Sequence, residues 1–290
     1  MSESYGDKIS RIIISFILFL IALSCLAPVL NILSISLSGK QAVESGQVLL
    51  WPLDITLQSY ETLFKGTRIL SALSNGLQMT IGGVLLSMAF TICAAYPLSK
   101  SYFFGRRVFT LLILFTMVFS GGLIPTYLVV KSLGLIDTYW AIWLPGVIST
   151  FNMLIMRSYF EGISSEVEDA ARIDGCNEWQ LMSKIILPLS MPVIATLLLF
   201  YGVGYWNSFM SVLIYINSTD KYTITVLIQQ MIQSQSLLTE ALANDVQAIQ
   251  LVPDGIKSAG IIILILPMVI VYPFLQKYFV QGVMLGSVKG

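Results

Sequence analysis

Six charged residues lie close together in one short segment of this largely apolar chain. Residues 167–189 read VEDAARIDGCNEWQLMSKIILPL, with acidic and basic side chains on both sides of Gly175 and Pro188 near the end. Carboxylates at this spacing could hold a divalent metal for catalysis, or they could contact another protein. Metal-dependent transfer chemistry would need further aspartates downstream at helical spacing, and none follows until Asp220. The segment is therefore better suited to a protein contact than to catalysis.

Missing residue types exclude several other kinds of chemistry. The chain has no histidine, which excludes His-based metal sites and Ser-His or Cys-His catalysis. Its three cysteines show no metal-ligand spacing, so we expect packed thiols. A phosphate-binding loop needs an upstream glycine and a Ser or Thr after Gly-Lys, but Gly39-Lys40 is followed by Gln41 and lacks the upstream glycine. We predict no metal, no cofactor and no ATPase site in this chain.

The composition indicates a membrane protein. Hydrophobic residues make up 56% of the 290 residues and charged residues only 11%, whereas soluble domains carry about 25% charged residues. A helix of about 20 apolar residues crosses a bilayer core of about 30 Å. We therefore predict an all-α polytopic membrane protein with six transmembrane helices in a single transmembrane domain over residues 1–290. The six uncharged stretches are 12–37, 73–98, 108–130, 139–156, 185–215 and 259–275.

The basic residues predict the orientation. An even number of spans places both termini on one side, and Lys and Arg are enriched in cytoplasmic loops. With the termini inside, the cytoplasmic set is Lys8, Arg11, Lys100, Arg106, Arg107, Arg157, Arg172, Lys184, Lys277 and Lys289. The outer set is smaller: Lys40, Lys65, Arg68, Lys131, Lys221 and Lys257. The charged segment then lies in a cytoplasmic insert at about 158–187.

This insert is predicted to form two short helices. Ser165 and Glu168 have the spacing of a capping box, so the first helix can begin there, and Gly175 is a natural left-handed stop. A second helix is favoured by Asn177 and Gln180, which have a similar cap spacing, and it runs toward the fifth span. The first helix would carry a flat face of small apolar residues, which are Val167, Ala170 and Ala171. Such a face suits close approach by another backbone.

The same segment resembles a known signature. Asp169-Ala170-Ala171, Gly175 and Ile185-x-Leu187-Pro188 match the E-A-A…G…I-x-L-P pattern of permease subunits of binding-protein-dependent ABC importers. Asp169 stands where the family usually has Glu, which keeps the charge on a shorter side chain. Further matches follow the carbohydrate branch, the MalG-like and LplC-YtcP-like permeases. They are FSGGLIPTY at 119–127, YWN at 205–207, YPFLQKYF at 272–279 and GVMLGSVKG at 282–290.

The resemblance implies a type I ABC importer permease in a bacterial plasma (inner) membrane. It implies a second homologous permease, a dimer of ATP-binding subunits that bind ATP and Mg, and an extracytoplasmic sugar-binding protein. The first helix of the insert would be the coupling helix that contacts the ATPase. Its contact residues would be Val167, Glu168, Asp169, Ala170, Ala171, Arg172, Asp174 and Gly175.

The substrate path is predicted from polar and aromatic residues within the spans. Aromatic faces with amide groups suit an oligosaccharide, although the same residues also join helices. The candidates are Tyr201, Tyr205, Trp206, Asn207, Asn152 and Gln78. Another small polar solute remains an alternative substrate. An ion-coupled secondary transporter remains the alternative mechanism, but it would usually need a charged residue within a span. No basic run indicates a nucleic-acid partner, so the expected surroundings are lipid and carbohydrate.

Overall fold

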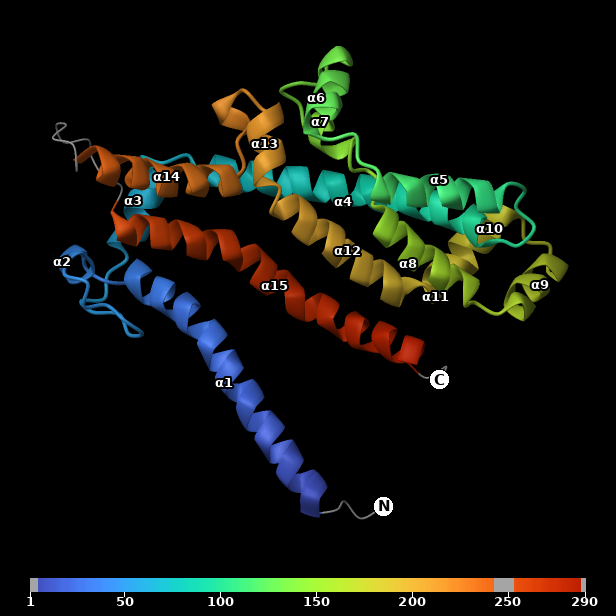
Figure 1. The fold of residues 1–290 in the computed structure, drawn as a ribbon, viewed down its shortest axis with the longest axis horizontal. Coiled ribbons are helices and arrows are strands. Elements are labelled where there is room, and N and C mark those ends of the chain that lie inside the picture. The colour runs from blue at the N-terminus through green and yellow to red at the C-terminus, as the bar shows by residue number, and fades with distance from the viewer. Residues whose placement is uncertain (1–4, 243–252, 288–290) are drawn as a thin grey trace. The chain divides into compact units, whose positions relative to one another are not determined.

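The computed structural model describes residues 5–242 and 253–287, which are helical with connecting loops and contain no strand. The chain divides into two compact units, one formed by residues 1–70 and 227–266 and the other by residues 71–226 and 267–290. Three helices continue from one unit into the other: α4 (Ile69–Ser99), α14 (Ile224–Leu242) and α15 (Asp254–Ser287). Figure 1 shows the succession of helices along the chain.

The first unit begins with a long apolar helix, α1 (Tyr5–Ser36). Most large apolar side chains of α1 are exposed, including Ile12 and Phe16, as expected where lipid or another subunit replaces water. The C-terminal end of α1 is tied to the following loop, because the Asn31 amide donates to the carbonyls of Val48 and Leu49. Two short helices, α2 (Lys40–Glu44) and α3 (Gln58–Gly66), complete this part of the unit.

The second unit contains the remaining helices. They are α5 (Arg106–Val118), α6 (Leu123–Ser132), α7 (Trp140–Trp143), α8 (Thr150–Glu161), α9 (Ser165–Ile173), α10 (Glu178–Leu181), α11 (Leu187–Leu189), α12 (Met191–Trp206) and α13 (Phe209–Tyr215). A π-helical turn at Met182–Ile186 joins α10 to α11. Helix α8 packs against α5 and α12 (Figure 1). Met153 and Met156 of α8 and Leu197 of α12 are fully buried in this core.

Several predicted spans are interrupted. Three described helices are long and apolar enough to cross a membrane, at Ser10–Ser36, Ile69–Ser99 and Asp254–Phe274. The third predicted span bends by 114° between α5 and α6, where Gly121-Gly122 breaks the helix. The fifth bends by 80° between Leu189 and Met191. The described residues thus contain three continuous spans, or up to five with each bent pair counted as one, and six stays a prediction.

The fourth predicted span is also shorter than expected. Helix α7 ends at Trp143, and α8 begins only at Thr150. Pro145-Gly146 lies between them, where proline cannot continue the hydrogen-bonding ladder and glycine favours a turn. Ser149 caps α8, because its side chain accepts a hydrogen bond from the backbone N–H of Asn152 at 3.4 Å. The apolar run from Tyr139 to Met156 is therefore two helices with a break.

Candidate functional site

The charged segment forms α9 and α10, and α9 begins one residue earlier than its predicted cap. The N-cap is Ser164, whose side chain accepts from the backbone N–H of Glu166 at 3.2 Å. The prediction of Ser165 as the N-cap is therefore wrong. The sequence does not distinguish the two positions, because either of two adjacent serines can act as an N-cap. The capping-box role predicted for Glu168 is also absent, because its carboxylate pairs with Lys100.

Helix α9 ends at Ile173, and Gly175 forms the predicted left-handed stop just beyond it. Gly175 has a φ of +84°, which favours glycine because a Cβ crowds the backbone in this region. The N–H of Cys176 donates to the carbonyl of Ala171 at 3.0 Å, and the N–H of Gly175 donates to that of Arg172 at 3.0 Å. These two bonds form a Schellman motif. The motif fixes the direction in which the chain leaves α9 for α10.

One face of α9 is buried against its own chain. Ala171 and Glu168 are only 4% and 8% exposed, and they are three residues apart and so share a face. The Glu168 carboxylate forms an ion pair with Lys100, which follows the end of α4. The Lys100 ammonium also lies 4.7 Å from the centre of the Tyr96 ring. Glu168 was predicted to contact the ATPase, but in this structure its charge is directed toward α4.

A second polar cluster links α9 to the end of α4 and to α10. The Arg172 guanidinium donates to Glu178 Oε1 at 2.9 Å, and the Tyr96 hydroxyl donates to Glu178 Oε2 at 2.8 Å. Arg172 also donates to the Tyr102 hydroxyl at 3.1 Å. Burial raises the pKa of Glu178, but the hydrogen bonds from Tyr96 and Arg172 outweigh it and leave this pKa below its ordinary value. Glu178 is therefore held as a carboxylate.

The rest of α9 is exposed. The exposed side chains include Val167, Ala170 and Asp169 of the family signature, whereas Ala171, predicted to share an exposed face with Val167 and Ala170, is buried against α9's own chain. The sequence analysis missed Ile173 and Trp179, which are 86% and 69% exposed. Ile173 could have been found, because it follows Ala170 at three-residue spacing and so lies on the same side of the helix. The exposed side chains Val167, Asp169, Ala170 and Ile173 of α9, together with Trp179 of α10, are called the α9 surface below.

Helix α10 connects this surface to the spans. Its predicted capping box is confirmed: the Asn177 side chain accepts from the N–H of Gln180 at 2.8 Å, and Gln180 accepts in return at 3.1 Å. The π-helical turn follows directly, and the chain bends at Ser190 between Pro188 and Pro192. Proline removes a backbone donor on each side of Ser190. Helix α12 therefore begins at an angle of 80° to the helical segment Glu178–Leu189.

Most aromatic candidates for the substrate path lie in helix contacts. The Tyr201 hydroxyl bonds with Thr91 of α4 at 2.7 Å, and the Tyr205 hydroxyl bonds with Ser87 at 2.8 Å. A Cβ at Gly83 would come within 2.8 Å of the Tyr205 ring, so this glycine lets α4 approach α12 closely. These two tyrosines hold α4 and α12 together within the second unit.

The other four candidates separate into buried and exposed side chains. Trp206 and Asn152 are 3% and 5% exposed, and the Trp206 ring would lie 3.4 Å from a Cβ at Gly76. Gln78 and Asn207 are exposed. Gln78 donates to Ser74 of its own helix at 3.1 Å, and Asn207 donates to the carbonyl of Val203 at 2.9 Å. A role in the substrate path stays a prediction for all six residues.

At the other end of the second unit, Asp137 forms a cluster that the sequence analysis missed. Asp137 Oδ1 accepts from the backbone N–H groups of Asn217 and Ser218, at 3.0 and 2.9 Å, and Oδ2 accepts from Lys221 at 2.6 Å. The hydrogen bonds from Lys221 and Ser218 lower the Asp137 pKa well below its ordinary value. The carboxylate thus joins the loop after α6 to the loop after α13.

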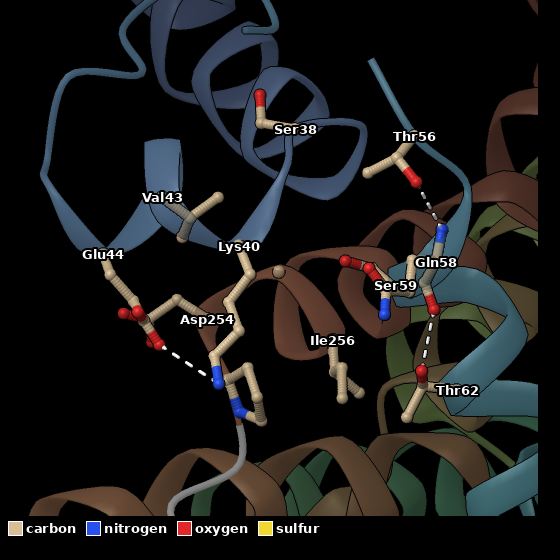
Figure 2. Close-up of a pocket in the computed structure, with 12 residues that line it drawn as sticks. Ser38, Lys40, Val43, Glu44, Thr56, Gln58, Ser59, Thr62, Asp254 and Ile256 are labelled. Carbon is tan, nitrogen blue, oxygen red and sulfur yellow. Dashed lines mark hydrogen bonds and ion pairs between the residues drawn. The ribbon is translucent and has the colours of Figure 1, made fainter. Parts of the chain in front are cut away.

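The first unit contains a separate cavity lined by both apolar and polar side chains. It measures about 260 Å³ and lies among α2, the start of α3 and the first turn of α15. Figure 2 shows Lys40 beside Glu44, with which it forms an ion pair at 3.7 Å. Asp254 at the rim pairs with Lys257 at 3.1 Å. Because these charges are paired, the cavity offers hydroxyl and amide groups rather than net charge.

Comparison with known proteins identifies the family. Residues 2–285 match the family described as "Binding-protein-dependent transport system inner membrane component". The chain belongs to this family. Two relatives of this inner membrane component come from Bacillus subtilis (strain 168). The polygalacturonan/rhamnogalacturonan transport system permease protein YtcP is 39% identical over 284 residues, covering 98% of this chain and 99% of YtcP. Protein LplC is 41% identical over 266 residues, covering 91% of this chain and 89% of LplC.

Two chains in solved structures have the same fold as this chain. A chain from the crystal structure of a bacterial ABC transporter involved in the import of the acidic polysaccharide alginate superposes with a TM-score of 0.85 at 34% identity, covering 96% of this chain and 99% of that chain. A chain from the alginate transporter in complex with an alginate pentasaccharide-bound periplasmic protein has a TM-score of 0.57 at 17% identity, covering 94% and 96%. The predicted family and permease fold are confirmed.

Proposed function

We propose that this chain is the permease subunit of an ATP-driven importer of oligosaccharides and forms part of their path across the membrane. The observation that carries this proposal is the family match over residues 2–285. It is supported by relatives of nearly full length that are named for polysaccharide transport. Because two of those names specify acidic polymers, we propose oligosaccharides that contain uronic acids as the first substrates to test.

We further propose that the α9 surface contacts a separate ATPase subunit. Its exposed apolar side chains, Ile173 and Trp179, are unusual for an unpartnered cytoplasmic helix and suit a buried position in an interface. The chain's only Gly-Lys pair lacks the surrounding residues of a phosphate-binding loop. Hydrolysis would therefore take place on the partner, with ATP and Mg bound there.

Within the spans, the exposed amides are the best candidates for the substrate path. Gln78 and Asn207 present polar groups from apolar helices, and such groups avoid lipid. A water-filled path or a second permease would satisfy them. The hydroxyls of Tyr201 and Tyr205 already have partners between α4 and α12, so these two rings would shape the path rather than bind sugar directly.

The proposed complex contains a second, homologous permease, an ATPase dimer and an extracytoplasmic sugar-binding protein. Movement of α9 on closure of the ATPase dimer would pass through α10 and the π-helical turn to α12. Sugar and ATP then each favour one of two states, inward-facing or outward-facing, because each binds the two states with different affinity. The greater number of Lys and Arg residues in the proposed cytoplasmic loops supports an orientation with both termini inside.

Uptake into proteoliposomes tests this proposal. The complex is reconstituted with its binding protein, and uptake of oligogalacturonate and of a neutral malto-oligosaccharide is measured with and without ATP. We expect ATP-dependent uptake that persists when ionophores collapse proton and sodium gradients. Uptake that needs an ion gradient and proceeds without ATP would instead establish a secondary transporter.

A further inference from the structure

Lys100 is buried, although its position in a loop would allow a lysine side chain to extend into water. It follows directly after α4 in a proposed cytoplasmic loop, yet its side chain is only 6% exposed. Long lysine side chains usually extend their charge to water, and burying an ion costs several kcal/mol even after the surroundings relax. The charge is compensated within the chain by Glu168, whose side chain is 11% exposed. The two residues are 68 positions apart, so the pair fixes tertiary structure rather than a local turn.

The same end of α4 contacts both halves of α9. Glu168, in the first half, pairs with Lys100. Arg172, in the last turn, shares Glu178 with Tyr96, which lies four residues before Lys100. No peptide segment connects α9 to α4 directly, because the chain between them passes through α5 to α8. Movement passed directly from α9 to α4 therefore goes through these side chains.

Helix α4 is also joined to α12. The hydroxyl pairs Ser87–Tyr205 and Thr91–Tyr201 measure 2.8 and 2.7 Å and are buried. The polar contacts thus run from α9 to the end of α4, and from the middle of α4 to α12. Helix α12 is also reached from α9 along the chain through α10 and the bend at Ser190. Two routes connect α9 to the same pair of spans.

We propose that Lys100 is a positioning residue, which holds α9 through the buried Glu168 pair so that displacement of α9 moves α4 together with α12. This inference rests on the proposed function. Breaking one member of a buried pair leaves the other charge unpaired, which is much more disruptive than replacing both. Loss of Lys100 should therefore release the first half of α9 from the end of α4, while Arg172 and α10 still hold its last turn.

The test uses the complete complex reconstituted with its binding protein. Lys100→Met is compared with the charge exchange Lys100→Glu/Glu168→Lys. Arg107→Met is the control, because Arg107 is an exposed cation that also follows the end of α4 and shows no ion pair among the described residues. Sugar transported per ATP hydrolysed is measured on purified complexes containing equal amounts of ATPase. This ratio is independent of how much complex assembles.

We expect Lys100→Met to lower the ratio by about tenfold or more, since the unpaired Glu168 would leave its buried site. The charge exchange should restore a substantial part of it, and Arg107→Met should match the unmodified protein. An unchanged ratio in Lys100→Met would overturn the proposal, as would a charge exchange that assembles normally without raising the ratio. A purely structural role would lower only the yield of complex.

Two further observations keep the test decisive. If Lys100→Met does not assemble, Lys100→Met/Glu168→Gln removes both charges and so the unpaired ion. Its ratio is expected to fall by less than in Lys100→Met, because the ion pair that holds α9 is lost but no buried charge is left unpaired. An unchanged ratio in this double variant would overturn the proposal.

If the unmodified complex shows no ATP-driven uptake, the proposed function itself fails. If that complex transports normally and only the Lys100 effect is missing, this inference alone fails.

Discussion

Replacing Gly175 tests whether the backbone at the end of α9 controls coupling. Its φ of +84° lies in the left-handed region, and a Cβ added there would have no other atom within 4 Å. A substitution therefore introduces backbone strain without a steric clash. For an L-residue this strain is roughly 1–2 kcal/mol, which shifts the population of the native turn by a factor of about 5–30.

The size of the effect should follow the conformational preference of the new residue and not its volume. Asn tolerates the left-handed region, so Gly175→Asn should stay close to the unmodified protein. Gly175→Ala should be intermediate, and Gly175→Val should be the most impaired because a β-branched residue is a genuine outlier there. Sugar transported per ATP in proteoliposomes is the assay, with complex yield recorded separately.

Gly134 provides a matched control in the same unit. It has a φ of +68°, and a Cβ there would also meet nothing within 4 Å. It ends α6 with bonds of the same type, from Gly134 N–H to Lys131 and from Leu135 N–H to Val130. Gly134→Val should lower thermal stability to a similar extent but leave the transport ratio intact. Normal coupling in Gly175→Val, or equal impairment in Gly175→Asn and Gly175→Val, would refute this reasoning.

Three further predictions concern other parts of the chain. Asp137→Ala should lower stability by about 1–3 kcal/mol because it leaves a cation and backbone donors unpaired. The pKa of Asp137 is depressed in the folded protein, so its stabilisation is present above the unfolded pKa of about 3.9 and is lost as pH falls toward the lower folded pKa. The thermal unfolding temperature of the variant should therefore depend less on acid than that of the unmodified protein. Tyr205→Phe should lower stability by about 0.6 kcal/mol, as typical for a hydrogen bond between membrane helices, and leave substrate affinity unchanged in uptake assays; a changed affinity would make its hydroxyl a sugar ligand. Asn207→Ala should weaken uptake without changing thermal stability or ATPase binding, and unchanged uptake would remove Asn207 from the substrate path.

The sequence predicted those elements that composition and local chemistry determine. The long apolar runs of α1, α4 and α15 required helices, and Gly175 and Asn177 marked the boundary between α9 and α10. The breaks in the third and fourth spans were harder to predict, although Gly122 and Gly146 mark them, because an uninterrupted apolar run gave the stronger signal. The choice between Ser164 and Ser165 as a cap could not be made locally, since both can accept the same bond.

The part of the candidate site that could not be predicted from the sequence depends on contacts between residues far apart in the chain. No local pattern indicates that Glu168 turns toward Lys100, because the two residues meet only after α4 and α9 pack together. The Asp137 cluster has the same origin, since its partners are about 80 residues away along the chain. Ile173 differs, because helical spacing alone would have placed it beside Ala170 on the α9 surface.

The most direct measurement of the central claim is a detergent pull-down of the tagged chain from its native membrane, followed by mass spectrometry of the proteins recovered with it. The unmodified chain is compared with Gly175→Val, with Gly134→Val as the control. We predict that the unmodified and control chains recover a second permease and a P-loop ATPase, and that Gly175→Val recovers the permease with much less ATPase. A chain recovered without any ATPase in all three samples would contradict the account and favour a self-contained transporter.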